Sequence, residues 1–380
     1  MQTTQYHWSE IGVCAEVSCF ESEASLNEVV EYHVMLHVLP AKDLFEAQYD
    51  RLRKAEALLF QEPKLQGMQV VLKRVFLSDA ANQASFLPNE VCLSCIQQPP
   101  LDGSKIAEWL YLQKGSQVSH QKGCVVVDHN GYRHLFQGRM LCSSGDSYTQ
   151  TKTLLAQYGT TLQGFSATLS DHCLRTWFFV RDVDTQYAGL VKARREYFAE
   201  QGLNAHTHFI ASTGIGGVPE SGNAIVQMGA YALMGFAPEQ LRYLQALSHM
   251  SPTAQYGVTF ERGTLVEYGD RAQIFVSGTA SIDSQGQVMH VGDIVGQTKR
   301  MWENVECLLA EGNAGLEDIA QMIVYLRDGA DYAVVKEMFE RKFPGVPKVI
   351  TLAPICRPSW LIEMECIAVA HRDNSKYRNF

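Results

Sequence analysis

The sequence predicts an α/β (α+β) fold made of three tandem copies of one unit, each a mixed sheet with two helices on one face. Three observations predict it: related segments recur along the chain, strand-like and helix-like apolar patterns alternate within each copy, and two polar stretches divide the 380 residues into thirds. The free face of each sheet needs cover, which neighbouring copies can provide. We therefore expect a single-chain pseudo-trimer.

The first and third copies align without a gap. Their shared pattern is an amphipathic helix, a turn and a strand that ends in Asp, VFLSD in one copy and VYLRD in the other. Six identical pairs lie 249 residues apart, as from 48 to 297: Gln48 and Gln297, Arg51 and Arg300, Leu59 and Leu308, Val75 and Val324, Leu77 and Leu326, Asp79 and Asp328.

A middle copy lies between them. Its helices TQTKTLLAQYG (149–159) and YAGLVKARREYF (187–198) match 296–312 and 332–343, and its strands WFFVRD (177–182) and VQMGAYALM (226–234) match 324–328 and 362–370. Chance likeness between amphipathic helices would not keep this spacing over two helices and two strands. The polar stretches 114–120 and 250–257 then place the copies at 1–115, 116–252 and 253–380.

Each copy is expected to contain the same elements in the same order. Early strands such as 32–39 and 272–282 have period-2 or continuous apolar character, and a helix follows them. In the third copy Asp293 is a plausible N-cap and Gly312 a plausible stop for this helix. A strand, a second helix and two closing strands complete the unit. The helix has one apolar stripe: Ile294, Met301, Val305, Leu308 and Leu309.

Composition excludes several classes of function. The net charge of −9 argues against a nucleic-acid or membrane-surface binder, because both need a basic face. No apolar stretch is long enough to span a membrane, and the start MQTTQYHWSEIG lacks the features of a signal peptide. The ten cysteines are scattered, and the only CxxC pair, Cys92 and Cys95, is expected on a strand. These features predict a reduced cytoplasmic protein.

The histidines do not predict a metal site. His33 and His37 are four residues apart on an expected strand, a separation of about 13 Å. His206 and His208 are expected to share a strand face, with no third ligand beside them. The sequence contains no HExxH and no nucleotide-binding motif, so we expect neither a metal nor a cofactor.

The third copy resembles the RidA/YjgF family over essentially its whole length. The residues that carry this resemblance are VSGTASID (276–283), GQTKRMWENVECLLAEG (296–312), VYLRD (324–328) and LIEMECIAVA (361–370). Members of that family are homotrimers of a chorismate-mutase-like α/β unit with ligand clefts between subunits. The resemblance implies that three copies in one chain reproduce such a trimer, and that the protein is a monomer.

A narrower resemblance is to the chorismatases, which hydrolyse the enolpyruvyl ether of chorismate. It implies a cofactor-free hydrolase that acts on a small anionic carboxylate and yields pyruvate with a cyclohexadiene or hydroxybenzoate product. It is carried by RTWFFVRD (175–182), STGIGG (212–217), FERG (260–263), SGTASI (277–282), HVGD (290–293) and APICRPSWLIEME (353–365), with QQPPLDGSKIAEWLYL (97–112) also similar.

One position departs from the RidA pattern. Those proteins usually carry an Arg fifteen residues before the strand Glu, and this chain has Lys348 there. An Arg guanidinium can hold a carboxylate with two parallel hydrogen bonds, whereas the Lys ammonium acts only as a point charge. A RidA-type enamine or imine deaminase is therefore disfavoured but stays an alternative, as does a non-catalytic ligand-binding regulator on the same scaffold.

Glu363 is the candidate general acid. Strand alternation places Glu363 and Glu365 on one face of LIEME, a costly arrangement unless that face meets water, a partner or a substrate. A strand at the solvent edge is the plainer alternative. Protonation of an enol ether carbon requires a carboxylic acid with a raised pKa, and the resemblance places that role on Glu363. It also places a product-determining role on Cys356, for which a buried apolar group is the alternative.

A dianionic substrate needs at least two cationic groups near the pocket. The available set is Arg175, Arg262, Lys348 and Arg357. Backbone near Thr213 and Gly214 could also approach an anion, although STGIGG suits a plain turn better, and Ser277 and Gly278 come from the matched SGTASI strand.

We expect only one cleft to be fully equipped. Alignment of the closing strands puts Gln227 opposite Glu363, whereas in the first copy either Ala107 or Glu108 falls at that place. The Glu363 cleft is expected to gather Lys348, Arg357 and Cys356 from its own copy, and a neighbouring copy is expected to form its other wall. The middle copy is favoured, through STGIGG and RTWFFV, and the first copy stays an alternative.

Overall fold

The computed structural model describes residues 1–22, 29–91 and 93–380, and within them the chain forms three six-stranded sheets. The three sheets share one strand order, which confirms the tandem-copy prediction. The first sheet runs β1 (Gln2–Trp8), β2 (Val13–Phe20), β3 (Val30–Val38), β6 (Ile106–Lys114), β4 (Gln69–Leu77), β5 (Leu93–Gln97).

The other two sheets repeat this order strand for strand. The second runs β7 (Gln117–Gln121), β8 (Cys124–His129), β9 (Tyr132–Leu141), β12 (Val226–Met234), β10 (Cys173–Val180), β11 (Ala211–Gly216). The third runs β13 (Leu241–Leu244), β14 (Gly263–Glu267), β15 (Arg271–Ala280), β18 (Ile362–His371), β16 (Ile319–Leu326), β17 (Lys348–Leu352). In each sheet the last strand of the copy is central and antiparallel to both neighbours.

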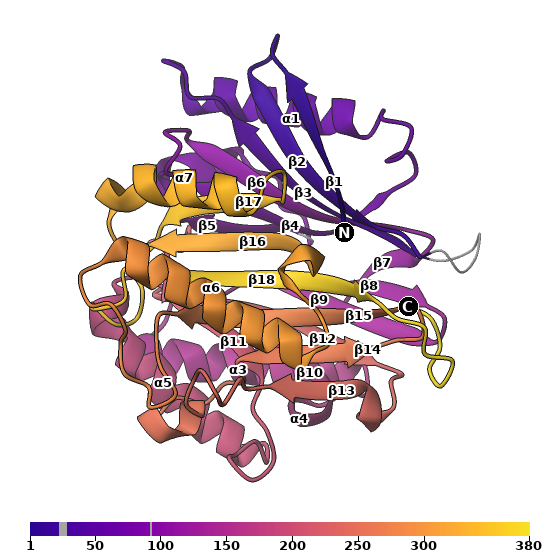
Figure 1. Cartoon of the computed structure of the whole chain (residues 1–380), viewed down its shortest axis with the longest axis vertical. Helices are drawn as coiled ribbons and strands as arrows, with labels where there is room; N and C mark the ends of the chain where they lie inside the picture. The colour runs from indigo at the N-terminus through magenta and orange to yellow at the C-terminus, as the bar shows by residue number, and fades with distance from the viewer. Residues whose placement is uncertain (23–28, 92) are drawn as a thin grey trace.

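Helices cover the outer sheet faces, and α6 and α7 lie across the third sheet (Figure 1). The prediction of a second long helix in the first copy is wrong. VFLSD is followed only by the single turn α2 and a 3₁₀ turn, and Pro88 then ends the segment. The α-helices are α1 (Phe45–Leu59), α2 (Ala80–Gln83), α3 (Ser147–Gly164), α4 (Leu169–His172), α5 (Val183–Glu200), α6 (Ile294–Glu311) and α7 (Tyr332–Lys342).

The helix boundaries predicted for α6 are confirmed. The Asp293 side chain accepts a hydrogen bond from the Gly296 N–H, and Gly312 stands at the C-cap. Met301, Val305 and the leucine pair that follows are fully buried against the sheet, so the apolar stripe forms the inner face of the helix.

A buried glutamine repeats in all three copies. The side-chain oxygens of Gln48, Gln150 and Gln297 each accept a hydrogen bond from a backbone N–H at the start of the closing strand. Those N–H groups belong to Lys105, Ile225 and Leu361. The first helix of each copy is thus tied to its closing strand by the same bond, which explains why this glutamine recurs in the repeat.

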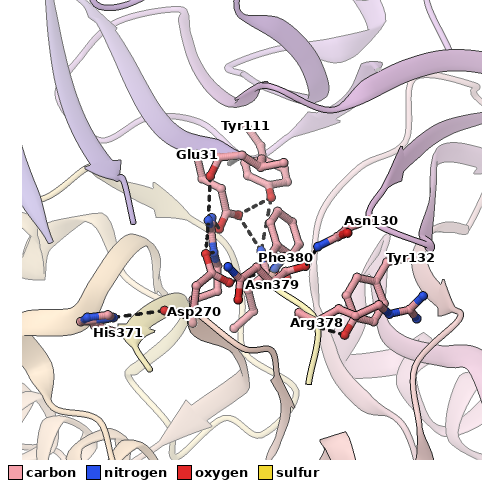
Figure 2. Close-up of polar contacts among 12 residues, drawn as sticks. Glu31, Tyr111, Asn130, Tyr132, Asp270, His371, Arg378, Asn379 and Phe380 are labelled. Carbon is pink, nitrogen blue, oxygen red and sulfur yellow. Dashed lines mark hydrogen bonds and ion pairs between the residues drawn. The ribbon is translucent and has the colours of Figure 1, made fainter. Parts of the chain in front are cut away.

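Polar contacts around the end of the chain connect residues of the three sheets (Figure 2). The Arg271 guanidinium is fully buried and lies over the rings of Phe20 and Phe380, at 4.6 and 4.7 Å from their centroids. It donates to Glu31 at 2.7 Å and to Asp270 at 2.6 Å. Carbonyl groups of the last residues accept from groups of the second sheet: Tyr132 donates to Arg378 O and Asn130 to Asn379 O.

We expect the protein to be a monomer, because the three copies already cover one another's inner sheet faces. Light scattering should give a mass near 42.5 kDa. A mass three times that value would contradict the single-chain trimer and indicate that whole chains, rather than copies, associate.

Candidate active site

A cavity of about 340 Å³ lies between the second and third copies. The second copy contributes α5 and β11 to its walls, and the third contributes the segment before β14, the end of β15 and the loop that leads into β18. Glu363 is the only acidic residue among its described lining residues. The second copy therefore forms one wall of the Glu363 cavity, as expected.

Glu363 lies in a central strand, so the alternative of a solvent-edge strand is wrong. Its Cα partners are Ala280 on β15 and Tyr325 on β16, and only 4% of the residue is exposed. Burial, and then the nearby Glu365 carboxylate, raise the pKa of Glu363 to about 8, against a smaller opposite effect of Arg175. The carboxyl is therefore protonated at neutral pH, as a general acid requires.

Glu365 is held by groups from the other two copies. Its carboxylate accepts from Arg74 of the first copy at 3.0 Å, and from Arg175 and the Trp177 indole of the second copy at 2.7 and 3.1 Å. The structure thus places Arg175 beneath the cavity, engaged with Glu365, rather than in the cavity wall. Arg175 is not brought together with the other candidate substrate-binding cations.

Lys348 lies in a different cavity, so its expected place beside Glu363 is wrong. Its ammonium contacts Glu16 of the first copy at 2.6 Å and lines a cavity of about 260 Å³ between the third and first copies. The cause is topological: β17 is an edge strand of the third sheet, and its first residue faces the next copy rather than its own β18.

The cations that do line the first cavity come mostly from α5. Arg262 and Arg357 of the third copy are there, with Lys192, Arg194 and Arg195 of the second. The sequence analysis missed those three. A signal was available, because the aligned positions of the third-copy helix are Glu337, Phe339 and Glu340, so basic residues stand where that helix has none.

STGIGG forms strand β11, so the turn expected there is wrong. Gly214 and Gly278 line the cavity, whereas Thr213 and Ser277 are buried and are not among its described lining residues. A Cβ at position 278 would overlap the Glu363 carboxylate. A larger residue there would displace this carboxyl, so glycine leaves room for Glu363 at the place that it occupies.

Cys356 lines the cavity beside Glu363 and Tyr187. Burial, and then the Glu363 charge, raise the pKa of its thiol to about 12, so it is neutral at neutral pH and unsuited to act as a thiolate nucleophile. Its neighbour Arg357 lies over the Trp360 ring at 5.1 Å from the centroid. The structure brings Cys356, Arg357 and Glu363 together, as expected.

The positions equivalent to Glu363 differ in each copy. Glu363 pairs with Tyr325 across β16 and β18, Gln227 pairs with Phe179, and Ala107 pairs with Phe76. The residue of the first copy that is equivalent to Glu363 is therefore Ala107 and not Glu108. Glu108 approaches Lys73 at 3.9 Å and belongs to a separate buried cluster. Of the three equivalent positions, one carries a carboxyl.

The remaining histidine candidates do not come together as a metal site in the part of the chain that the structure describes. His206 and His208 lie in a turn and a coil segment, so the shared strand face is wrong, and the His208 ring stacks on Tyr243. Cys95 is buried in β5, whereas Cys92 lies outside the described residues. In the described ranges, no group of three or more His, Cys, Asp or Glu side chains is placed to hold a metal ion, and no helix is long and apolar enough to cross a membrane.

His37 lines the second cavity between two carboxylates of its own copy. Its ring nitrogens lie 3.7 Å from Glu16 and 3.6 Å from Asp102, and Glu16 also contacts Lys348. Burial alone would lower the pKa of His37, but the two carboxylates outweigh it and raise the pKa to about 9.

This raised pKa predicts an alkaline loss of stability. The contribution of His37 is fully present below its ordinary pKa of 6.5 and is lost as pH rises through about 9. We expect the free energy of unfolding to fall by roughly 1–3 kcal/mol over this window from this group, measured by urea denaturation. His37→Gln should flatten that part of the curve and the exposed-site control His206→Gln should not. Identical curves for wild type and His37→Gln would contradict it.

Comparison with known proteins identifies relatives of the third copy and of the whole fold. The family model described as Endoribonuclease L-PSP matches residues 264–370. A RutC family protein of Pyrococcus abyssi is 37% identical over 97 residues, which are 25% of this chain and 76% of that protein. The 3-aminoacrylate deaminase RutC of Acinetobacter baylyi is 29% identical over 97 residues, 25% of this chain and 77% of that protein.

Among solved structures, a chorismatase matches most of the chain. It covers 81% of this chain and 95% of its own, with a TM-score of 0.63 and 18% sequence identity. At this identity the match shows the fold alone, over the 81% of the chain that it covers. The fold of that part of the chain is therefore shared with a solved chorismatase.

Proposed function

This chain belongs to the RidA/YjgF (endoribonuclease L-PSP) family through its third copy, and from that premise we propose that it is a chorismatase-like hydrolase. Its substrate would be chorismate or a related small dianionic carboxylate. The products would be pyruvate and a cyclohexadiene or hydroxybenzoate. The fold that it shares with a chorismatase supports this proposal over a function specific to single-copy relatives.

One observation carries the proposal: a buried, protonated carboxyl faces a cavity lined by cations. Glu363 has a pKa of about 8, and five Lys or Arg side chains line the same cavity. A dianionic substrate would be attracted to those positive charges, and its reacting carbon would need a proton.

The reaction would begin with proton transfer from Glu363 to the terminal carbon of the enolpyruvyl group. The ether-bearing carbon becomes an oxocarbenium ion, which the newly formed Glu363 carboxylate stabilises. Water attacks that carbon and gives its proton to the carboxylate, which restores the acid. The resulting hemiketal loses the ring alcohol, a dihydroxycyclohexadiene carboxylate, and leaves pyruvate, so atoms and charge balance without a cofactor. A hydroxybenzoate would form by the further loss of one water from this ring product.

The cations would orient the substrate across the cavity. Arg262 donates to the Ser251 carbonyl at 2.7 Å, and Arg194 donates to Ser212 at 3.2 Å. Such bonds hold each guanidinium in place before substrate arrives and reduce the entropy lost on binding. With Arg262 on one wall and Arg194 and Arg195 on the other, two carboxylates could be held at opposite ends.

A coupled assay tests the proposal. Purified protein with chorismate and lactate dehydrogenase should oxidise NADH as pyruvate forms. If no pyruvate appears but 3-aminoacrylate or another enamine is hydrolysed, the RutC likeness of the third copy gives the activity instead. If neither reaction occurs and chorismate still binds in calorimetry, the protein is a ligand-binding regulator.

Cys356 is expected to influence which ring product forms. Its neutral thiol lies in the cavity wall beside Glu363, where it can contact the ring but not act as a thiolate. We expect Cys356→Ala to change the ratio of ring products in chromatography and to leave the pyruvate rate within about threefold, because protonation still depends on Glu363. Unchanged products in a folded variant would show that Cys356 only fills space.

A further inference from the structure

The strand that faces Glu365 contains a β-bulge. Val276 pairs with Cys366 and Thr279 pairs with Met364, so Ser277 and Gly278 together lie opposite the single residue Glu365. Bulges redirect a strand locally and are frequent beside active sites. Here the extra residue sets where the backbone of Gly278 runs past the Glu363 carboxyl.

The position of Gly278 decides how much room that carboxyl has. A Cβ at Gly278 would overlap Oε1 of Glu363, so backbone and carboxyl are in close contact. A small inward shift of the bulge would push the carboxyl from its place, and an outward shift would open its buried side to water.

The bulge is held from the second copy by β11. The Ser212 N–H donates to Ser277 Oγ at 2.9 Å, and the Gly278 N–H donates to Thr213 Oγ1 at 2.9 Å. Thr213 is 1% exposed, so this bond is shielded from water. The bulge is therefore fixed across the copy interface by a hydrogen bond at each of its two residues.

Thr213 also contacts the ion-pair cluster beneath the cavity. Its Oγ1 accepts from Arg175 Nη2 at 2.5 Å, and the same nitrogen donates to Glu365 at 2.7 Å. A hydroxyl oxygen has two acceptor sites, and Gly278 and Arg175 occupy both. One oxygen thus connects the Glu365 cluster to the backbone that bounds Glu363.

We propose that Thr213 is a positioning residue for the acid: its hydroxyl fixes the Ser277–Gly278 bulge against Arg175 and so holds Glu363 in the geometry for proton transfer. This inference rests on the proposed function. Thr213 acts through Gly278, since it is absent from the described lining of the cavity. Its role differs from the substrate binding expected from the sequence.

Thr213→Val tests this role, with Thr213→Ser as the matched control. Valine keeps the shape but removes the acceptor, whereas serine keeps the hydroxyl. For Thr213→Val we expect kcat to fall roughly 10–100-fold while KM stays within about threefold, because the misplaced group is the acid and not the substrate-binding cations. Thr213→Ser should retain kcat within a few-fold. Thr213→Cys, with a weak acceptor, should fall between them and serves if valine prevents folding.

The pH profile separates positioning from a general loss of packing. Because the acid must be protonated, kcat of the wild type should fall as pH rises through the pKa of Glu363. In Thr213→Val this fall should move to lower pH by about half a unit, because a relaxed bulge admits water to Glu363 and lessens the effect of burial on its pKa. Thr213→Ser should keep the wild-type profile. Wild-type kcat and profile in Thr213→Val, or equal losses in the valine and serine variants, would overturn the inference.

The inference and the proposed function fail in different ways. Wild-type protein that releases no pyruvate from chorismate refutes the function alone. In that case infrared titration of the protonated carboxyl band, assigned to Glu363 by its absence in Glu363→Gln, gives the same test without turnover. A band that titrates at the same pH in wild type and Thr213→Val refutes the positioning role.

Discussion

Glu363→Gln will lower the rate of pyruvate release by roughly 10²–10⁴, the contribution expected from a positioned general acid. An amide can hydrogen-bond to the substrate but has no proton to give at neutral pH. KM should change little, since the cations that line the cavity are retained. Initial rates in the coupled pyruvate assay measure the effect.

The pH dependence of the wild-type enzyme follows from the same group. The acid must be protonated, so kcat should be level below the pKa of Glu363, about 8, and fall as pH rises through it. An enzyme whose rate instead increased over that range would use Glu363 as a base.

Gln227→Ala is the matched control, because Gln227 occupies the equivalent place in the second copy. It should leave turnover within a few-fold. Equal losses from the Gln227 and Glu363 variants would show that the active cavity has been assigned to the wrong pair of copies.

Arg271→Met will destabilise the protein by roughly 3–5 kcal/mol, because it leaves two buried carboxylates without their cation. Glu31 and Asp270 are each 1% exposed in their side chains and both contact this guanidinium. The loss should appear as a lower midpoint of urea denaturation at constant pH.

Two variants control for this effect. Arg341→Met removes an exposed helix pair with Glu337 and should cost no more than about 0.5 kcal/mol. Glu31→Gln combined with Arg271→Met should recover part of the loss, since one of the stranded charges is gone. An Arg271 variant as stable as the Arg341 variant would refute the central role of this cluster.

The repeat and its caps were predictable because they are local. The spacing from Gln48 to Gln297 reflects a bond between a helix and its own closing strand, and the Asp293 cap is formed within one turn. Glu363 was also predictable, since strand alternation and motif similarity both identify it. Such features depend on one copy alone.

The places of Lys348, Arg175 and Thr213 were not predictable, because their partners belong to other copies. Lys348 contacts Glu16, 332 residues away, and Arg175 contacts Glu365, 190 residues away. Sequence spacing gives the face on which a side chain lies but not which neighbour that face meets. The basic residues of α5 were missed for a different reason. The alignment of α5 with α7 was used to find residues that the two helices share, whereas these basic residues are the ones that α7 lacks at the aligned positions.

The covalent linkage of the three copies removes a constraint that symmetry imposes. In a homotrimer every substitution appears three times, so all three clefts must keep the same charges. Here Glu363, Gln227 and Ala107 stand at equivalent places, and one cleft is rich in cations while another pairs Lys348 with Glu16. A mutation can therefore alter one cleft and spare the other two, so each can evolve independently within a single chain.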